Sequence, residues 1–194
     1  MEEEKDRLAL IIVDMQDDFV LPGAPAVIAG ARDTVPKIKK ALDAFRQKGQ
    51  AVFHVTREYR EDGSDIEKPR LQAFLKRKYA VPGTPGCAIV AALRPLTGEY
   101  RIVKKRFSAF MNTELDLMLR RLGIGHIVVC GAQYPTCIRA TVFDAVAYGY
   151  SVTLLTDATS AQTEEIAAAN IRDIRAVGVE CVTVEEFLSR KICN

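Results

Sequence analysis

The chain has 194 residues, of which 48% are hydrophobic and 27% charged, and this composition is typical of one globular domain spanning residues 1–194. Its formal net charge of +2 is too small to indicate binding to nucleic acid or to an anionic membrane surface. The charged amino terminus predicts that there is no secretory signal, and the lack of an apolar stretch of roughly 20 residues predicts that there is no membrane span. The five cysteines are scattered and form no Cys-x-x-Cys pair, which predicts a reduced, cytoplasmic protein.

The first half of the chain predicts three strands and two helices, separated by loops rich in proline and glycine. Short apolar runs with β-branched residues predict the strands. The main helix carries one apolar stripe at helical spacing, with Pro36 in its first turn and Gly49 just past its end. In chain order, the predicted elements are a strand at residues 8–14, a helix at 33–48, a strand at 51–56, a helix around 71–78 and a short strand at 101–105.

The second half alternates strand and helix more regularly. Thr113 and Asp116 have the spacing of a capping box and predict the start of a helix that ends before Gly123. The following elements are a strand at 126–131, a helix at 136–148, a strand at 151–157, a helix at 163–177, a strand at 181–184 and one or two helical turns at 185–190. Strands alternating with helices predict parallel βαβ units, and hence a three-layer αβα sandwich with a Rossmann-like parallel sheet of about six strands.

Chemically active side chains follow several of the predicted strands. Asp14 ends the first strand, Arg57 follows the second, and Cys137 lies after the fourth. Lys104 and Lys105 end the third, and only one of them can point toward a given face because side chains alternate along a strand. Ligands of open parallel sheets bind beyond the carboxyl ends of the strands. We therefore expect a carboxylate, an amine and a thiol around one crevice.

Cys137 is the candidate nucleophile of this crevice. Its thiol falls in the first turn of a predicted helix, where the helix dipole and a nearby ammonium favour the thiolate, the nucleophile of acyl-transfer chemistry. The alternative is a buried structural cysteine, which is our interpretation of Cys130. Asp14 is the candidate base that deprotonates Cys137, whereas Asp17 and Asp18 are predicted to face solvent or form a turn.

Several other kinds of site lack their sequence patterns. There is no glycine-rich dinucleotide fingerprint, no P-loop and no Gly-x-Ser-x-Gly elbow. His54 and His126 lie on apolar strands without a partner at ligand spacing, so we interpret them as core or surface histidines. We expect no metal and no cofactor.

Three ordered segments carry a resemblance to a known family. They are "LIIVDMQDDF" (residues 10–19), "IVKKRFSAFMNTELDLMLRRLGI" (102–124) and "VVCGAQYPTCIRATVFDAVAYGY" (128–150). The chain resembles the isochorismatase-like cysteine hydrolase superfamily, which includes isochorismatases, nicotinamidases, N-carbamoylsarcosine amidohydrolases and ureidoacrylate amidohydrolases. The family's lysine lies four positions before a Ser-Ala-Phe element, which begins here at Ser108, so the resemblance selects Lys104 over its neighbour.

The resemblance implies a catalytic triad of Asp14, Lys104 and Cys137. In such enzymes the cysteine attacks a carbonyl group and forms a thioester that water hydrolyses, while the lysine stabilises the thiolate. A cis peptide between Ala132 and Gln133 turns the Gln133 N–H to join that of Cys137 in an oxyanion hole. The resemblance also implies a small-molecule substrate and a homo-oligomer, either a dimer or a tetramer.

The chain also departs from the family pattern. Nicotinamidases of this superfamily bind a metal through an Asp-x-His pair and a further histidine after the second strand, where this chain has Arg57 and Glu58. We therefore expect no metal. The candidate substrate-binding residues are Phe19, Arg57, Phe107 and Tyr134, with Tyr134 as an aromatic wall of the pocket.

These features favour a metal-independent cysteine hydrolase of a small amide, ureido or related carbonyl compound. One alternative is a catalytically silent member of the fold that acts as a binding or oligomerisation module. Another is an isochorismatase that acts on a vinyl ether. A thiol redox protein is disfavoured, because Cys137 has no resolving cysteine two or three residues away.

Overall fold

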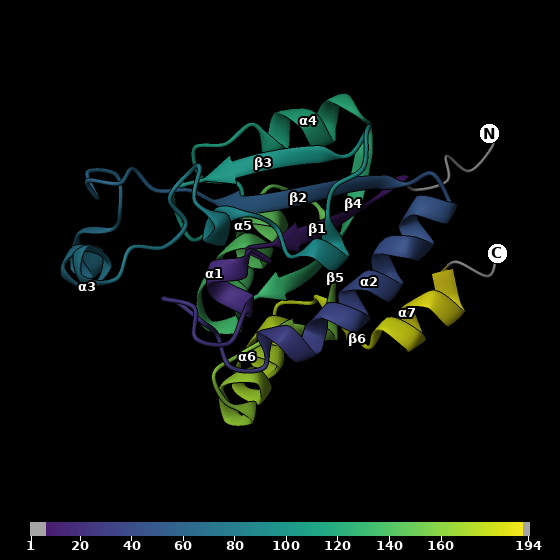
Figure 1. Ribbon diagram of the computed structural model, residues 1–194. Helices are drawn as coiled ribbons and strands as arrows, with labels where there is room; N and C mark the ends of the chain where they lie inside the picture. The colour runs from purple at the N-terminus through teal and green to yellow at the C-terminus, as the bar shows by residue number, and fades with distance from the viewer. Residues whose placement is uncertain (1–6, 192–194) are drawn as a thin grey trace.

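The computed structural model describes residues 7–191; Cys193 and the six amino-terminal residues, on which the expectation about a secretory signal rests, lie outside this range. The described residues form one parallel sheet of six strands in the order β3-β2-β1-β4-β5-β6 (Figure 1). The strands are β1 (Arg7–Val13), β2 (Ala51–Arg57), β3 (Tyr100–Lys104), β4 (Ile124–Ala132), β5 (Ser151–Ser160) and β6 (Glu180–Val182). The predicted number of strands and their parallel arrangement are confirmed.

Helices cover both faces of the sheet (Figure 1). One layer holds α1 (Asp17–Val20), α2 (Ala31–Gln47) and α7 (Val184–Lys191), and the other holds α4 (Leu115–Arg121), α5 (Arg139–Ala147) and α6 (Glu164–Ala176). The short α3 (Leu71–Lys76) lies to one side, after a 3-10 turn at Lys68–Arg70. None of the helices within residues 7–191 is long and apolar enough to cross a bilayer.

The apolar strands are buried on both faces because successive side chains enter different cores. On β1, Leu10 and Ile12 pack into the core beneath α2 and α7, whereas Ile11 and Val13 pack beneath α4 and α5. All four side chains are at most 2% exposed. Burying each such side chain contributes about 1.5–3 kcal/mol, so the central strand is anchored from both sides.

The expected capping box at the start of α4 does not form. Glu114 is the residue before the helix, and its backbone angles (φ −85°, ψ 5°) are not the extended ones of a side-chain cap. Thr113 Oγ1 still accepts a hydrogen bond from Leu115 N at 3.3 Å, but the Asp116 carboxylate binds Arg120 on the next turn. The helix therefore begins one residue later than the capping box predicted, with Glu114 rather than Thr113 as the residue before it.

The sequence also gave no sign of α1, which changes the interpretation of Asp18. Asp18 was expected to face solvent or to form a turn. It does not face solvent: its carboxylate is buried, and its Oδ2 accepts a hydrogen bond from Ala80 N at 2.7 Å. Asp18 thus joins the turn after β1 to the long segment between β2 and β3.

The order of the strands reverses between β1 and β4, and Gly131 allows their ends to approach. Gly131 has φ +116°, and a Cβ added there would overlap the backbone of Val13. Only glycine fits this approach. The carboxyl ends of β1 and β4 therefore lie side by side at the topological switch point, where open parallel sheets bind their ligands.

Candidate active site

A cavity of about 270 Å³ opens at this switch point. Its wall contains a carboxylate, a thiol, two guanidinium groups and two side-chain amides among apolar side chains. The lining residues are Asp14, Phe19, Ala26, Ile28, Arg57, Arg70, Phe107, Ala132, Gln133, Thr136, Cys137 and Gln162. The polar groups come from separate segments of the chain, and the parallel sheet brings them together.

Asp14 and Lys104 form a buried ion pair beneath the cavity. Asp14 follows β1 in the left-handed region (φ +52°), and its N–H donates to Val55 O at 2.8 Å. Lys104 is fully buried at the end of β3, and its Nζ donates to Asp14 Oδ2 at 2.7 Å. Lys105 is exposed, as the alternation along the strand predicted. Asp14 Oδ1 is buried without a hydrogen-bond partner among the described residues, so it can accept a proton or a substrate N–H group.

The Cys137 thiol receives two hydrogen bonds from other side chains. Arg57 Nη2 donates to Sγ at 3.1 Å, and Thr136 Oγ1 donates to it at 3.6 Å. Cys137 lies in a helical turn, as predicted, but this turn (Tyr134–Ile138) is π-helical and precedes α5. Single π-turns occur frequently at functional sites.

The contact to sulfur belongs to Arg57 rather than to Lys104. Within the described part of the chain, Lys104 Nζ donates only to Asp14 and to the Arg106 carbonyl, the latter at 3.3 Å. Lys104 thus fixes the carboxylate, and the guanidinium of Arg57 faces the sulfur while its Nε lies 3.7 Å from Asp14 Oδ2. The sequence placed Arg57 near the crevice but gave no indication of this role.

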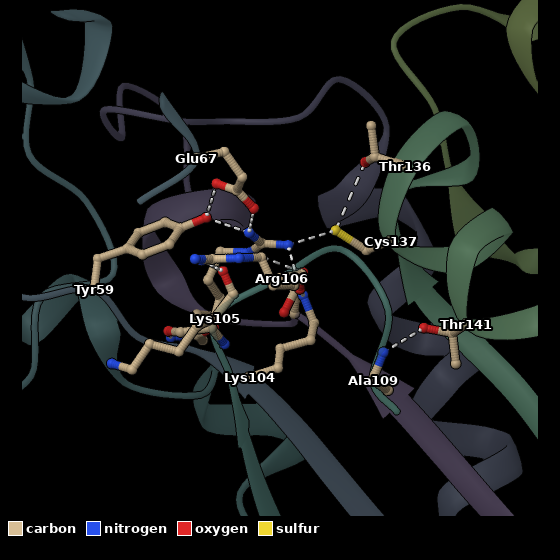
Figure 2. Close-up of polar contacts among 12 residues, drawn as sticks. Tyr59, Glu67, Lys104, Lys105, Arg106, Ala109, Thr136, Cys137 and Thr141 are labelled. Carbon is tan, nitrogen blue, oxygen red and sulfur yellow. Dashed lines mark hydrogen bonds and ion pairs between the residues drawn. The ribbon is translucent and has the colours of Figure 1, made fainter. Parts of the chain in front are cut away.

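A network of buried groups holds Arg57 in place. Its side chain is 2% exposed, and Nη1 donates to Glu67 Oε1 at 3.0 Å and to the Tyr59 hydroxyl. The Gln16 amide binds both the N–H and the carbonyl of Arg57, at 2.7 and 2.9 Å. Figure 2 shows Tyr59 and Glu67 on one side of this network and Cys137 on the other. Burial alone would lower the pKa of Arg57, but attraction to Cys137, Asp14, Tyr59 and Glu67 outweighs it and raises that pKa well above its ordinary value.

The aromatic candidates divide into two that line the cavity and one that does not. Phe19 and Phe107 line it, and the Arg57 guanidinium lies 5.4 Å from the Phe107 ring centre. The expected aromatic wall at Tyr134 is wrong: its side chain enters the core beneath α4 and α5, and its hydroxyl donates to Thr156 O at 3.1 Å. The π-turn directs this side chain away from the cavity.

The segment before Cys137 has the backbone that the resemblance implied. The peptide between Ala132 and Gln133 is cis, and both residues line the cavity. Gln133 Oε1 is buried and has no hydrogen-bond partner among residues 7–191. A residue that lines the cavity therefore carries a second buried acceptor without a partner, besides Asp14 Oδ1.

The residues after β2 do not fit a metal. Within residues 7–191, no group of three or more His, Cys, Asp or Glu side chains has the arrangement to hold a metal ion. A guanidinium occupies the site in their place, and a permanent cation at Arg57 opposes the binding of another cation. His54 is buried within β2, and its Nε2 lies 2.8 Å from Glu99 Oε2, outside the cavity.

The other described cysteines are structurally different from Cys137. Burial raises the pKa values of the Cys87, Cys130 and Cys181 thiols above their ordinary values. Neither Cys87 nor Cys130 nor Cys181 lines the cavity, whereas Cys137 does and is bound to a guanidinium. Cys137 is thus the thiol best placed for chemistry.

Sequence reasoning missed several residues of the site. Gln16 lies within residues 10–19, one of the segments that carry the resemblance, but nothing in that segment predicted that its amide would bind the backbone at the end of β2. Tyr59, Glu67 and Arg70 lie between β2 and α3, in a stretch without the hydrophobic spacing of a strand or helix that would predict where their side chains point. Gln162 follows β5 and also lines the cavity.

Comparisons with known proteins agree with this architecture. Residues 8–186 match the family model of the isochorismatase domain. The chain is 40% identical to the "probable inactive nicotinamidase At3g16190" of Arabidopsis thaliana, over 96% of this chain and 97% of that protein. It is 33% identical to the ureidoacrylate amidohydrolase RutB of Rhizobium rhizogenes, over 78% of this chain and 69% of that protein.

A solved structure agrees more closely still. The crystal structure of an isochorismatase family protein from Desulfovibrio vulgaris superposes with a TM-score of 0.91 at 51% identity, covering 95% of this chain and all of that chain. The family model covers most of the sequence, and the fold and the sequence relatives point to the same group. The chain therefore belongs to the isochorismatase family of hydrolases.

Proposed function

We propose that the protein is a metal-independent cysteine hydrolase that cleaves a C–N bond of a small amide or ureido compound through a thioester. The observation that carries this proposal is the hydrogen bond from the buried guanidinium of Arg57 to Cys137 Sγ, in the cavity that also contains Asp14. A cation at hydrogen-bond distance stabilises a thiolate, which is the form that attacks carbonyl carbon.

The first half of the reaction uses these groups as follows. Asp14 Oδ1 takes the thiol proton, and the sulfur of Cys137 forms a bond to the carbonyl carbon. The N–H groups of Gln133 and Cys137 stabilise the oxygen, which becomes negative in this step. The tetrahedral intermediate collapses, the C–N bond breaks, and the leaving nitrogen receives the proton from Asp14.

Water completes the cycle. Asp14 removes a proton from water, the resulting oxygen attacks the thioester carbon, and the acid is released as the C–S bond breaks. Lys104 holds Asp14 in place through both steps with its 2.7 Å bond to Oδ2, leaving Oδ1 available. The sulfur leaves as a thiolate that Arg57 stabilises, and Asp14 returns the proton taken from water to it, so both groups regain their starting form.

The two unused acceptors favour a C–N bond over a vinyl ether. Asp14 Oδ1 and Gln133 Oε1 are buried without partners among the described residues, and an unpaired buried acceptor costs about 1–3 kcal/mol. An amide or ureido group brings N–H donors that satisfy them, whereas an ether has none. The ureidoacrylate amidohydrolase among the relatives acts, by its name, on such a group.

The Arabidopsis relative does not contradict this proposal. Its name describes it as probably inactive as a nicotinamidase. In this chain, Arg57 and Glu58 occupy the segment where the resemblance implied that nicotinamidases hold a metal, so we expect no nicotinamidase activity here either. A homo-oligomeric state and a cytoplasmic location stay predictions.

A substrate panel and two cysteine variants test the proposal. We expect release of ammonia from at least one member of a panel of small primary amides and ureido acids. We expect complete loss of turnover in Cys137→Ala and Cys137→Ser, with unchanged circular dichroism. Cys181→Ala, which removes a buried thiol away from the cavity, is the matched control and keeps its activity. Turnover that survives in either Cys137 variant refutes the assignment.

Alkylation separates an enzyme from a silent binding module. Near neutral pH, iodoacetamide labels Cys137 faster than Cys87, Cys130 and Cys181, as followed by peptide mass spectrometry. The geometry supports this expectation, because of the four described cysteines only Cys137 lines the cavity beside a guanidinium. Equal rates at all four positions would favour the module.

A further inference from the structure

We infer that Glu67 is a positioning residue for the reaction. Its carboxylate holds the guanidinium of Arg57 against the sulfur of Cys137 and prevents that guanidinium from pairing with Asp14, the proposed base. The inference rests on the proposed function, since it supposes that Cys137 attacks the substrate. Glu67 itself does not line the cavity, so it acts through Arg57 and not on the substrate.

Both terminal nitrogens of the Arg57 guanidinium have all their hydrogens engaged. Nη1 donates to Glu67 Oε1 at 3.0 Å and to the Tyr59 hydroxyl. Nη2 donates to Cys137 Sγ and to the Arg106 carbonyl, each at 3.1 Å. The group is planar and rigid. Fixing Nη1 at Glu67 therefore sets the direction in which Nη2 meets the sulfur on the opposite side of the network (Figure 2).

Asp14 competes with the sulfur for the same guanidinium. Nε of Arg57 lies 3.7 Å from Asp14 Oδ2, farther than Nη1 lies from Glu67. A guanidinium and a carboxylate favour a bidentate pair, which here would use Nε and Nη2. That pair would remove Nη2 from the sulfur and occupy Asp14 Oδ1, the oxygen that has no partner among residues 7–191 and that takes the thiol proton. Glu67 opposes this movement because it attracts the other end of the group.

Glu67 is charged and fixed well enough to act as this anchor. Its side chain is 13% exposed, and its Oε2 accepts a hydrogen bond from the Tyr59 hydroxyl at 2.7 Å. Burial would raise the pKa of Glu67, but the bond from Tyr59 and attraction to Arg57 and Arg70 outweigh burial and lower that pKa. The carboxylate is therefore ionised near neutral pH, where the anchor is needed.

The charge of Glu67 and its role as an anchor have opposite effects on the thiol. A negative charge disfavours a nearby thiolate, so loss of the charge alone would make Cys137 more reactive. Loss of the anchor would move the guanidinium off the sulfur and make Cys137 less reactive. We expect the second effect to be larger, because Nη2 touches the sulfur at 3.1 Å whereas Glu67 lies beyond Nη1. The charged groups around the sulfur and its guanidinium are Asp14 after β1, Arg57 on β2, Glu67 and Arg70 after β2, and Lys104 on β3.

The test is the rate of iodoacetamide labelling at Cys137 as a function of pH, in protein that circular dichroism shows to be folded. Glu67→Gln keeps the shape of the side chain and removes its charge. We expect the pH of half-maximal labelling to rise by about one unit, equivalent to a fall of about tenfold in labelling near neutral pH, the effect of one weakened hydrogen bond to a charged group. Glu67→Asp retains the charge and should restore part of the wild-type rate.

Glu61→Gln is the matched control. Glu61 lies on the same segment, but its side chain is 74% exposed, pairs with Lys78 and does not line the cavity. The variant removes the same formal charge and should leave the midpoint of labelling unchanged. A loss of stability would not move the midpoint in folded protein either, so the shift is specific to the position of the guanidinium.

A double-mutant cycle tests whether Glu67 acts through Arg57. In the Arg57→Met background there is no guanidinium to hold, so adding Glu67→Gln should not raise the midpoint further. A further rise in the double variant would show that Glu67 supports the thiol by another route, and would overturn the inference.

Tyr59→Phe provides a second variant that decides the question if Glu67→Gln does not fold. It removes only the hydroxyl that joins Arg57 Nη1 to Glu67 Oε2, and it keeps the ring contacts with Phe74 and Tyr79. We expect a smaller rise of the midpoint in the same direction. An unchanged midpoint in Tyr59→Phe overturns the inference in that case.

The outcomes separate this inference from the proposed function. Selective labelling of Cys137 with a midpoint that is unchanged or lower in folded Glu67→Gln overturns the anchor and leaves the nucleophile in place. Labelling of the wild-type protein that shows no preference for Cys137 refutes the proposed function itself.

Discussion

Replacing Arg57 by methionine tests which cation serves the thiol. Methionine keeps most of the side-chain length and removes the guanidinium, so Cys137 Sγ loses its 3.1 Å donor while the bond between Lys104 and Asp14 stays. If Arg57 stabilises the thiolate, reactivity falls although the lysine of the triad is intact. If Lys104 alone does so, reactivity is unchanged.

The structure gives the size of the effect. One hydrogen bond to a charged group contributes about 1.5–3 kcal/mol, which corresponds to a fall of about 10- to 150-fold in the rate of Cys137 alkylation near neutral pH. Arg57→Met also leaves Glu67 half-buried without its 3.0 Å partner. Breaking a buried ion pair costs about 3–5 kcal/mol, so we expect the Tm to fall by about 6–20 °C.

The assay is the rate of iodoacetamide labelling at Cys137, measured by mass spectrometry at a temperature where circular dichroism shows that every variant is folded. Lys105→Met removes the same formal charge from an exposed position and serves as the control. Arg57→Lys keeps a point charge without the planar fork and should give an intermediate rate. A folded Arg57→Met protein that labels as fast as wild type would refute the role of Arg57.

Three further predictions concern residues that support the sheet or the site. Gly131→Ala should lower the free energy of unfolding in urea by at least about 2 kcal/mol, from strain and overlap, whereas Gly125→Ala, with open space around it on the same strand, should change it little. Lys104→Met should abolish ammonia release from any substrate found, and Lys105→Met should not, because of these two lysines only Lys104 holds Asp14, the proposed base. Burial would raise the pKa of Glu99, but hydrogen bonds, first among them that from an arginine, lower it to about 2. Its stabilising effect is therefore complete above the ordinary value of 4.5 and disappears as the pH falls toward 2, so urea unfolding of Glu99→Gln should depend less on pH in that interval.

Hydrophobic patterning was sufficient to predict the strands and their parallel arrangement in one sheet. Apolar runs bounded by glycine and charge predicted each strand. The rule for open parallel sheets placed Asp14, Arg57, one of two lysines and Cys137 near one crevice; Asp14, Arg57 and Cys137 line the cavity, and Lys104 reaches it through Asp14. Alternation along β3 predicted that only one of Lys104 and Lys105 would point inward, and the resemblance selected Lys104, which is buried while Lys105 is exposed. The inferences from patterning succeed because they depend on the spacing of hydrophobic residues and on the order of the elements along the chain, both of which can be read directly from a sequence.

Directions of side chains outside regular structure could not be predicted. Tyr134 follows the cis peptide within a π-turn, where neither a strand nor an α-helix period applies, and its ring enters the core. Asp18 is buried by a contact with a loop more than 60 positions away. The bond from Arg57 to sulfur depends on Glu67, whose position no local pattern specifies.

The segment between β2 and β3 has a consequence for how this protein could change over generations. The groups that break the bond are anchored on or beside the sheet, while Arg70 is carried by a stretch that pairs with no strand. The same stretch carries Glu67, which holds Arg57 beside the sulfur. Substitutions, insertions or deletions there would therefore alter the wall of the cavity and the support of the thiol together, so this stretch can diverge only where the position of Glu67 is kept.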